Sequence, residues 1–387
     1  MPDSALPRVL HFVTGGFTGG ATQVAVKLVT AAGERGDAEA LLVVRRKRHT
    51  DSRRIDELRE RGLPIAAVPG WSHLATVLAL ARLCRQFRPD VLIAHGFSEH
   101  LWGRYAGLLA RVPYLVHVEH NTRERYTRWR LAQARWLADR TARIVGCSEG
   151  VRLRLLELGF PAARVMAIDN GINLAPFATV GTRPISERDP SILMVARFAR
   201  QKDHSTLLRA VALLRERGLR PQVYFAGGGR DSHRRAVEAL ARQLGIDDQL
   251  HCLGVVRDIP QRLGNTRIAV LSTLYEGMPL ALLEGMAAGC AVVGSRVPGV
   301  QEIITPGVNG LLAEPRDPQS LADALETLLR DDALAAKLST EARRRAFEHF
   351  DLKRMAEDYA AMVTQVLSEP SLRPLATIAR PRSTEQP

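Results

Sequence analysis

The chain has 387 residues, of which 46% are hydrophobic and 25% are charged, and it carries a formal net charge of +13. These values are typical of a globular protein with material for two or three domains, and they exclude a disordered or fibrous chain. The positive charge predicts an anionic partner, for which nucleic acid, an anionic membrane surface and phosphorylated small molecules all qualify. The four cysteines form no CxxC pair, which is typical of core residues in a reducing compartment.

The start of the chain, MPDSALPRVL, lacks the basic and apolar regions of a secretory signal. The longest mostly apolar run, 74–84, is interrupted by Arg82 and is too short to span a bilayer. We therefore expect a cytoplasmic protein, and a peripheral position on the inner face of the cell membrane stays open as an alternative.

Strand-like apolar runs alternate with helix-like segments along the whole chain. In the amino half the strand pattern covers 8–13, 39–44, 64–68, 91–94, 114–118 and 142–146. After residue 190 the alternation begins again, with strands expected at 191–196, 222–226, 249–254, 268–272 and 291–295. Their nearly continuous apolar composition indicates parallel sheets that are buried on both faces and connected by crossover helices.

The two runs meet at 171–190, a stretch rich in Gly, Pro, Ser and charge that we interpret as a hinge. The predicted fold class is therefore α/β, with two Rossmann-like doubly wound domains, 1–170 and 191–350, facing a central cleft. We expect the helix at 351–368 to pack back on the first domain. The remainder, 369–387, has the composition of a flexible tail.

Two glutamates, Glu276 and Glu284, stand eight positions apart in the apolar stretch YEGMPLALLEGMAAG. The stretch predicts a turn and then a helix with Pro279 at its first position, and the N-terminus of such a helix is a natural anion site. A nucleoside diphosphate bound there would present its ribose diol to Glu284, while Glu276 would face the group on the distal phosphate. The alternative is that Glu284 pairs with an arginine in a packed interior.

Two cations are expected at the same edge of the second sheet. Arg197 ends the first strand of that sheet, and Lys202 lies in the loop that follows. A guanidinium can bind two phosphate oxygens at once, and an ammonium adds a point charge. The chain contains no D-x-D motif, so a metal bridge to a diphosphate is not indicated. The charge of a leaving diphosphate would then be stabilised by Arg197, Lys202 and the helix dipole.

The segments ARFARQKDHSTLLRA, YEGMPLALLEGMAAGCAVVGSRVPGVQEII and NGLLAEPRDPQSLADAL resemble the donor half of the family 4 retaining glycosyltransferases of GT-B fold. The E-x7-E spacing of Glu276 and Glu284 is that family's signature, and the resemblance extends to about Leu367. It implies a metal-independent hexosyltransferase that moves a sugar from a nucleotide-sugar to an acceptor hydroxyl with retention of configuration, in polysaccharide, lipopolysaccharide or glycolipid assembly. It also implies donor contacts at Gly277, Met278 and Leu280.

In the amino half, GGFTGGATQVAVKLV resembles the glycine loop of the family, with Gly19 and Gly20 at the matching doublet. These glycines would let backbone N–H groups approach the diphosphate or the sugar. VHVEHNT is similar to the segment that carries the family's active-site histidine, which corresponds to His120. His95, which ends a strand, is the alternative, and His117 alternates into the core and is expected to be inert.

Two further donor contacts are predicted in the second half. The run AGGGRD follows a strand but does not complete the G-x-G-x-x-G fingerprint, because position 232 is serine. We interpret Gly227 as part of a turn that skirts the nucleotide. The resemblance implies that the backbone around Val256 and Arg257 contacts the base. Asn173 departs from the aspartate that is usual in the family after NGI.

Basic residues concentrate at 45–54 and 121–143. In the second segment, Trp129 and Trp136 stand seven apart, hence on one helical face, among arginines. Two interpretations stay open: contact with an anionic membrane, or a solvated helix whose tryptophans pack on the sheet.

Two other functions also stay open. A nucleotide-sugar epimerase would need a carboxylate cluster that we do not find in the amino half, and a nucleic-acid-binding protein would need a recognition motif.

Overall fold

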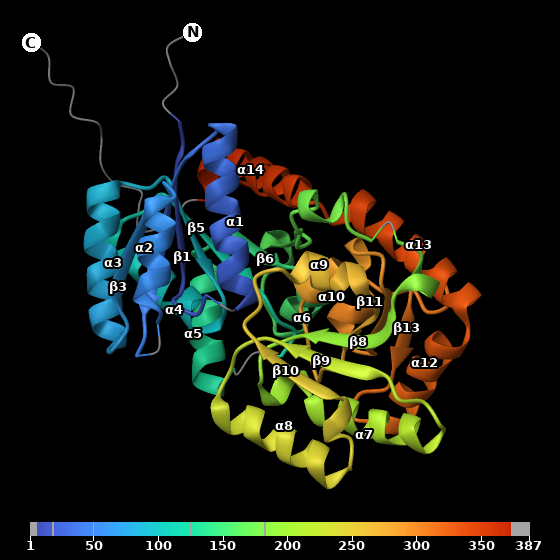
Figure 1. Ribbon diagram of the computed structural model, residues 1–387. Helices are drawn as coiled ribbons and strands as arrows, with labels where there is room; N and C mark the ends of the chain where they lie inside the picture. The colour runs from blue at the N-terminus through green and yellow to red at the C-terminus, as the bar shows by residue number, and fades with distance from the viewer. Residues whose placement is uncertain (1–5, 18, 49, 124–125, 182, 373–387) are drawn as a thin grey trace, which may run out of the picture. The chain divides into compact units, whose positions relative to one another are not determined.

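The structure is a computed structural model that describes residues 6–372, apart from 18, 49, 124–125 and 182 (Figure 1). The chain divides into two compact units, Met1–Ile168 with Ala356–Pro387, and Asp169–Met355. Each unit holds one parallel sheet with helices between its strands, which confirms the predicted α/β class with two doubly wound sheets.

The sheet of the first unit has seven strands in the order β3-β2-β1-β4-β5-β6-β7. The strands are β1 (Arg8–Thr14), β2 (Glu39–Arg46), β3 (Ile65–Pro69), β4 (Val91–His95), β5 (Tyr114–Glu119), β6 (Arg143–Gly146) and β7 (Val165–Ala167). All residues of β4 and β5 are buried, as expected for a sheet covered on both faces. The sequence did not predict β7, because three residues at the edge of a sheet are too few to show a period.

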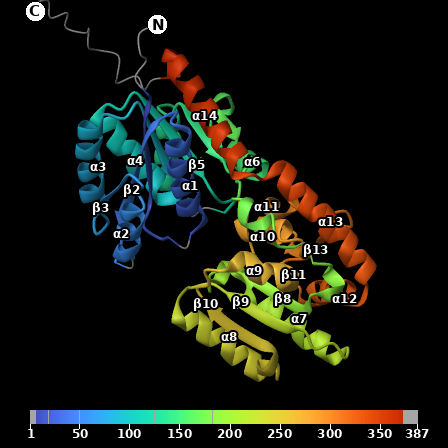
Figure 2. The same cartoon turned by 45° about the horizontal axis from the view of Figure 1, so that its top comes forward.

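Helices cover both faces of this sheet. They are α1 (Gly20–Arg35), α2 (Ser52–Glu60), α3 (His73–Phe87), α4 (Phe97–Ala110), α5 (Arg128–Ala138), α6 (Glu149–Glu157) and the part of α14 (Leu352–Ser368) that begins at Ala356. Buried side chains of α1 and α2 share one hydrophobic cluster, and those of α3 and α4 share another on the opposite face. In both views α14 lies beside α1 (Figures 1 and 2), where the two helices line a cavity together with β1.

The sheet of the second unit has six strands in the order β10-β9-β8-β11-β12-β13. They are β8 (Asp189–Val195), β9 (Gln222–Ala226), β10 (Leu250–Gly254), β11 (Thr266–Leu271), β12 (Ala291–Ser295) and β13 (Leu311–Ala313). The helices are α7 (His204–Glu216), α8 (Asp231–Gln243), α9 (Ile259–Asn265), α10 (Leu280–Ala287), α11 (Pro298–Gln301), α12 (Pro318–Arg330) and α13 (Asp332–His349). The edge strand β13 also has three residues and was not predicted.

The two stretches predicted to be irregular have different outcomes. The expected hinge, 171–190, belongs to the second unit, where it contains short 3-10 turns at Ala175–Phe177 and Ile185–Glu187 and the start of β8. The expected tail lies outside the described residues, except for 369–372, where Pro370–Leu372 form a 3-10 turn.

Both sheets have the same order, in which the chain crosses from one half of the sheet to the other after its third strand. The switch point is between β1 and β4 in the first unit and between β8 and β11 in the second. In open α/β sheets, ligands bind outside the carboxyl ends of the strands at this point. The candidate site residues of each unit are therefore sought in the loops after these strands.

Candidate active site

In the second unit, the loops after β8 and β11 are joined by hydrogen bonds at the switch point. The carbonyl oxygen of Gln201 accepts from Leu274 N at 2.9 Å and from Thr273 Oγ1 at 3.1 Å, and Gln201 Nε2 donates to Tyr275 O at 2.7 Å. The two loops therefore form one structure, and the residues that they carry hold fixed positions relative to one another.

Glu276 is buried in this structure, with 6% of its surface exposed. Its Oε1 accepts hydrogen bonds from Lys202 Nζ at 2.6 Å, from Thr273 Oγ1 at 2.7 Å and from Gln201 Nε2 at 3.3 Å. The ammonium of Lys202 and these polar donors offset the cost of removing the carboxylate from water. Lys202 and Glu276, which the sequence predicted to contact different parts of one nucleotide-sugar, therefore bind each other in this structure.

Arg197 and Glu284 are more accessible than this ion pair. Arg197 follows β8 and is exposed, and among the described residues its guanidinium has no hydrogen-bond or ion-pair partner. Glu284 lies in α10 and is half-buried. Pro279 caps α10 rather than occupying its first position, so the helix begins one residue later than expected. The first N–H groups of α10 lack carbonyl partners within the helix, as at any helix start.

The other predicted donor contacts surround the same loops. Gly227 follows β9, where a Cβ would lie 2.1 Å from Ala196 O, so only glycine allows this close approach to the loop after β8. Gly277 and Met278 are buried in the loop before α10, and Leu280 begins that helix half-buried. Beyond β10, Val256 is half-buried and Arg257 is exposed.

In the first unit, the glycine loop leads from β1 into α1. Gly19 caps the helix and Gly20 is its first residue. A Cβ at Gly20 would meet no atom of the described residues within 4 Å. The loop is held by Thr22 Oγ1, which donates to Thr14 O at 3.0 Å. Gly19 and Gly20 thus lie at the end of the loop that follows β1 at the switch point, where a Cβ at Gly19 would lie 3.2 Å from Gly16 O.

Three histidines form a hydrogen-bonded chain at the same switch point. His11 Nδ1 lies 3.0 Å from His95 Nε2, and His95 Nδ1 lies 3.2 Å from His120 Nε2, with neighbouring rings stacked. Burial lowers the pKa of His11 and of His120 to about 4, and burial together with the neighbouring His11 lowers the pKa of His95 well below 6.5. All three rings are therefore neutral at neutral pH, and their tautomers are coupled because each ring has one donor and one acceptor nitrogen.

This chain changes the expected roles of two residues. His95 is fully buried with both nitrogens engaged by histidines, so its place is that of a support for His120. His120 is half-buried, but its Nε2 faces His95 and its Nδ1 is buried without a hydrogen-bond partner among the described residues. The predicted bond from this ring to a sugar or an acceptor therefore requires the ring to turn, and it stays a prediction.

A second network fixes the backbone of His120. Glu119 Oε1 accepts from His120 N at 3.0 Å, and Glu119 Oε2 accepts from the Tyr126 hydroxyl at 3.3 Å. That hydroxyl lies 3.1 Å from His100 Nε2, and the fully buried Arg104 donates to His100 Nδ1 at 2.6 Å. The guanidinium and the carboxylate are thus connected through neutral groups, which offsets part of the cost of burying both.

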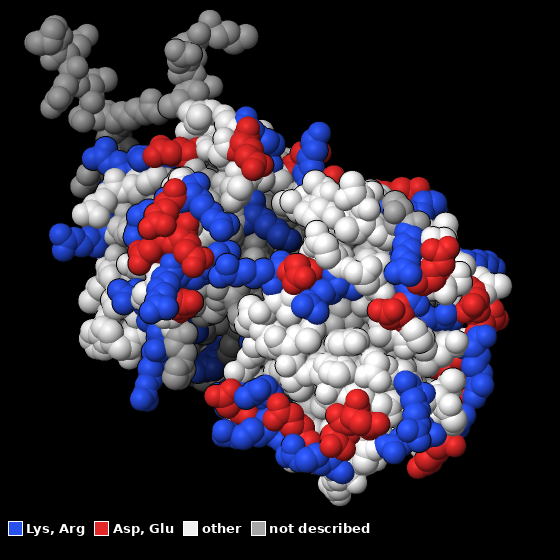
Figure 3. Space-filling model, in the orientation of Figure 1, with Lys and Arg blue, Asp and Glu red and all other residues white. Residues whose placement is uncertain are grey.

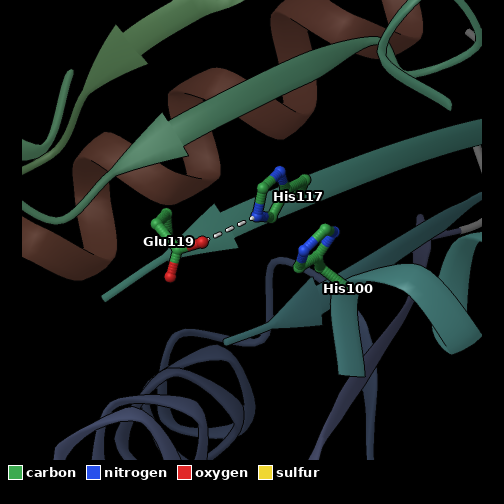
Figure 4. A group of neighbouring side chains, drawn as sticks. All are labelled: His100, His117 and Glu119. Carbon is green, nitrogen blue, oxygen red and sulfur yellow. Dashed lines mark ion pairs between the residues drawn. The ribbon is translucent and has the colours of Figure 1, made fainter. Parts of the chain in front are cut away.

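His100, His117 and Glu119 also bring potential metal ligands within 4.8 Å of one another (Figure 4). Because a guanidinium only donates, Arg104 makes His100 Nδ1 an acceptor, so the proton of the neutral ring is on Nε2. That nitrogen then has no lone pair for a cation, and the Tyr126 hydroxyl lies between it and Glu119. The cluster fits a hydrogen-bond network better than a metal centre. His117 is fully buried in the core, where it was expected.

Sequence reasoning missed the residues that support the site. Thr273 and Gln201 were overlooked because a threonine or glutamine in a loop has no distinctive pattern. His11 had a visible signal, since a histidine inside the apolar run RVLHFV must find a polar partner when it is buried.

In comparisons with known proteins, each unit matches a glycosyltransferase family. The family described as Glycosyl transferases group 1 matches residues 181–345, and Glycosyltransferase Family 4 matches residues 18–176. The lipopolysaccharide core biosynthesis glycosyltransferase LpsE of Rhizobium meliloti is 26% identical over 92% of this chain and 98% of its own length. The UDP-Gal:alpha-D-GlcNAc-diphosphoundecaprenol alpha-1,3-galactosyltransferase of Escherichia coli is 25% identical over 72% of this chain and 76% of its own.

Among solved structures, Anabaena Alr3699/HepE in complex with UDP and glucose superposes with a TM-score of 0.80, at 20% identity, over 93% of this chain and 100% of that chain. This similarity shows the GT-B fold. The two family matches together cover most of the chain, and the curated relatives named above are glycosyltransferases. The chain therefore belongs to the GT-B glycosyltransferases of family 4 and is itself a glycosyltransferase.

Proposed function

We propose that the chain transfers a hexose from a nucleoside diphosphate sugar to an acceptor hydroxyl, with retention of configuration and without a metal ion. The observation that carries the proposal is the Lys202–Glu276 ion pair, 2.6 Å long and largely buried at the switch point of the second sheet. A buried acid and base beside the exposed Arg197 are arranged for an anionic ligand that carries hydroxyl groups.

In this proposal the second unit binds the donor. Arg197, Lys202 and the N-terminus of α10 bind the diphosphate, and Glu284 accepts hydrogen bonds from the ribose diol. Gly227, Val256 and Arg257 border the base, and Gly277, Met278 and Leu280 border the diphosphate and the sugar. Glu276 faces the sugar once the diphosphate takes over part of the charge of Lys202.

The chemical step follows from this placement. The acceptor oxygen attacks the anomeric carbon from the face that the diphosphate leaves, the carbon–oxygen bond to the diphosphate breaks, and the acceptor proton passes to the departing phosphate oxygen. Arg197, Lys202 and the dipole of α10 supply positive charge where negative charge develops, which is the role that a metal ion would otherwise take. His120, Gly19 and Gly20 of the first unit are proposed to bind the sugar or the acceptor.

For the substrates, we infer a UDP-sugar donor and a lipid-linked sugar acceptor, in polysaccharide or lipopolysaccharide assembly. Support comes from the Escherichia coli relative, whose name specifies UDP-galactose and a diphosphoundecaprenol-linked acceptor, and from the Anabaena structure with bound UDP. A lipid-linked acceptor also fits a peripheral contact of 121–143 with an anionic membrane, which is one of the two interpretations that the sequence leaves open for this segment.

Donor binding is tested first by thermal shift with UDP-, GDP- and ADP-sugars. A ligand at 100 times its dissociation constant adds roughly 2.7 kcal/mol to the free energy of unfolding. Next, release of the nucleoside diphosphate is measured with and without a lipid-linked sugar acceptor, in the presence and absence of EDTA. We expect acceptor-dependent release that EDTA does not change, and an anomeric NMR coupling in the product equal to that of the donor. Inversion of the coupling, or loss of activity in EDTA, would refute the corresponding part of the proposal.

A further inference from the structure

The helix layer formed by α3, α4 and α5 in the first unit exposes large apolar side chains. Trp71, just before α3, is 83% exposed, and Trp129, in the first turn of α5, is 74% exposed. The exposure of Trp129 excludes the alternative that it packs on the sheet. We define the α3–α5 surface by these two residues and four that are about half or more exposed: Leu74, Leu78, Leu109 and Trp136.

Ring contacts connect the three helices of this surface. His73 of α3 stacks on Trp102 of α4 with ring centres 4.2 Å apart. Trp102 lies 6.2 Å from Tyr105, and Tyr105 stacks on Trp136 of α5, also at 6.2 Å. These ring contacts join the three helices into one layer, to which the exposed Trp136 belongs directly.

The charge of these helices is one-sided. Glu99 is their one acidic residue, and it is 4% exposed and paired with Arg45 and Lys47. Their exposed charged residues are arginines, namely Arg82, Arg85, Arg128 and Arg135. By contrast, α2 and α8 place acidic side chains beside basic ones, which is visible as red next to blue (Figure 3). The exposed Asp139 caps the end of α5, but within the three helices the described exposed charges are all basic, and this excess is complementary to an anionic partner.

The most exposed tryptophans lie near the candidate site of their unit. Helices α3 and α5 follow β3 and β5 and so begin at the carboxyl edge of the sheet, where β4 ends in His95 and β5 leads to His120. Trp71 and Trp129 stand at these helix starts. None of the described helices has both the length and the apolar composition needed to cross a bilayer.

We propose that the α3–α5 surface docks on an anionic lipid bilayer. Tryptophan rings prefer the headgroup zone, arginines bind anionic headgroups, and Leu74, Leu78 and Leu109 give aliphatic area that a nucleic acid would not use. Because Trp71 and Trp129 lie at the carboxyl edge of the sheet, docking through these two residues brings the edge that carries His120 to the membrane surface. The inference rests on the proposed function only in that a lipid-linked acceptor gives the docked edge a substrate.

The test is sedimentation of the full chain with vesicles, without donor or acceptor. Vesicles of phosphatidylcholine with 30 mol% phosphatidylglycerol are compared with pure phosphatidylcholine at several salt concentrations. We expect binding to the anionic vesicles that weakens with salt. The double variant Trp71→Ser, Trp129→Ser should lower the partition coefficient by about tenfold or more, because both apolar anchors are lost. As the control, Phe347→Ser removes an aromatic ring that is 37% exposed on α13 of the second unit, and it should change binding less than twofold.

Three results would overturn the proposal: no sedimentation of the unaltered chain at physiological salt, equal loss of binding in the control, or self-association of the chain that the double variant abolishes. Release of nucleoside diphosphate with a water-soluble acceptor is measured for the same variants and is expected to stay within twofold. If the unaltered chain binds vesicles but releases no nucleoside diphosphate with any acceptor, the proposed function fails while the docking surface stands.

Discussion

The two units share one strand order, but the side chains gathered at their switch points differ in charge. In the second unit, the loops after β8 and β11 bring together Lys202 and Glu276, and the loop after β8 also carries the exposed Arg197. In the first unit, the corresponding position between β1 and β4 holds His11 and His95, which connect to His120 as neutral rings.

Under the proposed function, this difference lets one topology serve two kinds of ligand. A charged loop suits a diphosphate, whose charge must be matched when water leaves. Neutral imidazoles hold a hydrogen-bonding surface in place without adding charge, which suits the hydroxyl groups of a sugar or acceptor. We therefore infer that the second unit supplies the electrostatic part of catalysis and the first unit supplies orientation.

The largest effect is expected from removing the cations of the second unit. Arg197→Ala and Lys202→Ala should each lower turnover by about 100-fold or more, because each removes charge from the leaving diphosphate. Only Lys202→Ala should also destabilise the fold, by about 1–3 kcal/mol, since it leaves the buried Glu276 without its cation. Steady-state kinetics and urea unfolding measure the two effects.

Arg197→Ala is the stability control for Lys202→Ala. Arg197 is exposed and unpaired among the described residues, so Arg197→Ala should unfold at the same urea concentration as the unaltered chain. Near-normal turnover in both variants would defeat the assignment of the diphosphate to this loop.

An intermediate effect is expected at Glu284. Glu284→Gln keeps the size of the side chain but removes the charge that accepts hydrogen bonds from a ribose diol. We expect the KM for the donor to rise on the order of tenfold or more, because charge-assisted hydrogen bonds are about twice as strong as neutral ones. Binding of the 2′-deoxy donor should be nearly equal in both proteins, and a full loss of affinity for that donor as well would assign Glu284 to the fold instead.

A smaller effect is expected from breaking the histidine chain of the first unit. His95→Phe removes both hydrogen bonds at the centre of the chain and should lower kcat about tenfold with the KM for the donor unchanged. The matched control is His117→Phe, since His117 is equally buried and makes no hydrogen bond to a described residue, its nearest polar contact being Glu119 Oε2 at 3.5 Å from Nε2. If the two variants lose the same activity, the hydrogen bonds between His11, His95 and His120 have no role in orienting the substrate.

The sequence was sufficient for the parts of the fold with a strong period. The apolar runs of β1, β4, β8 and β11 and the helices between them predicted both parallel sheets, whereas the strand order and the switch points come from the structure. It could not predict β7 or β13, because edge strands of three residues show no alternation.

For the candidate site, spacing predicted which residues lie near each other but not which of them bind one another. The acidic pair and the two cations were expected to face a ligand, whereas Lys202 Nζ lies 2.6 Å from Glu276. The link between His11 and His95 joins residues 84 positions apart and depends on the parallel register of β1 and β4, which a single sequence does not specify.

The smallest effect is a difference in acid stability between the two units. The described part of the first unit has four buried histidines with a lowered pKa, at 11, 95, 100 and 117, and the half-buried His120, whereas that of the second unit has one buried histidine, His204. A histidine with a pKa of about 4 when folded and 6.5 when unfolded binds more protons unfolded, so its stabilising effect is complete above pH 6.5 and is lost as the pH falls towards 4. All four tryptophans lie in the first unit, so their fluorescence reports on that unit alone. The circular dichroism signal at 222 nm reports on both units. We expect the fluorescence transition of the first unit to occur about half a pH unit above the part of the 222 nm transition that comes from the second unit, because more groups in the first unit resist protonation. His204→Phe should leave the fluorescence midpoint unchanged, and a single transition shared by both signals would show that the histidines of the first unit do not set its acid stability.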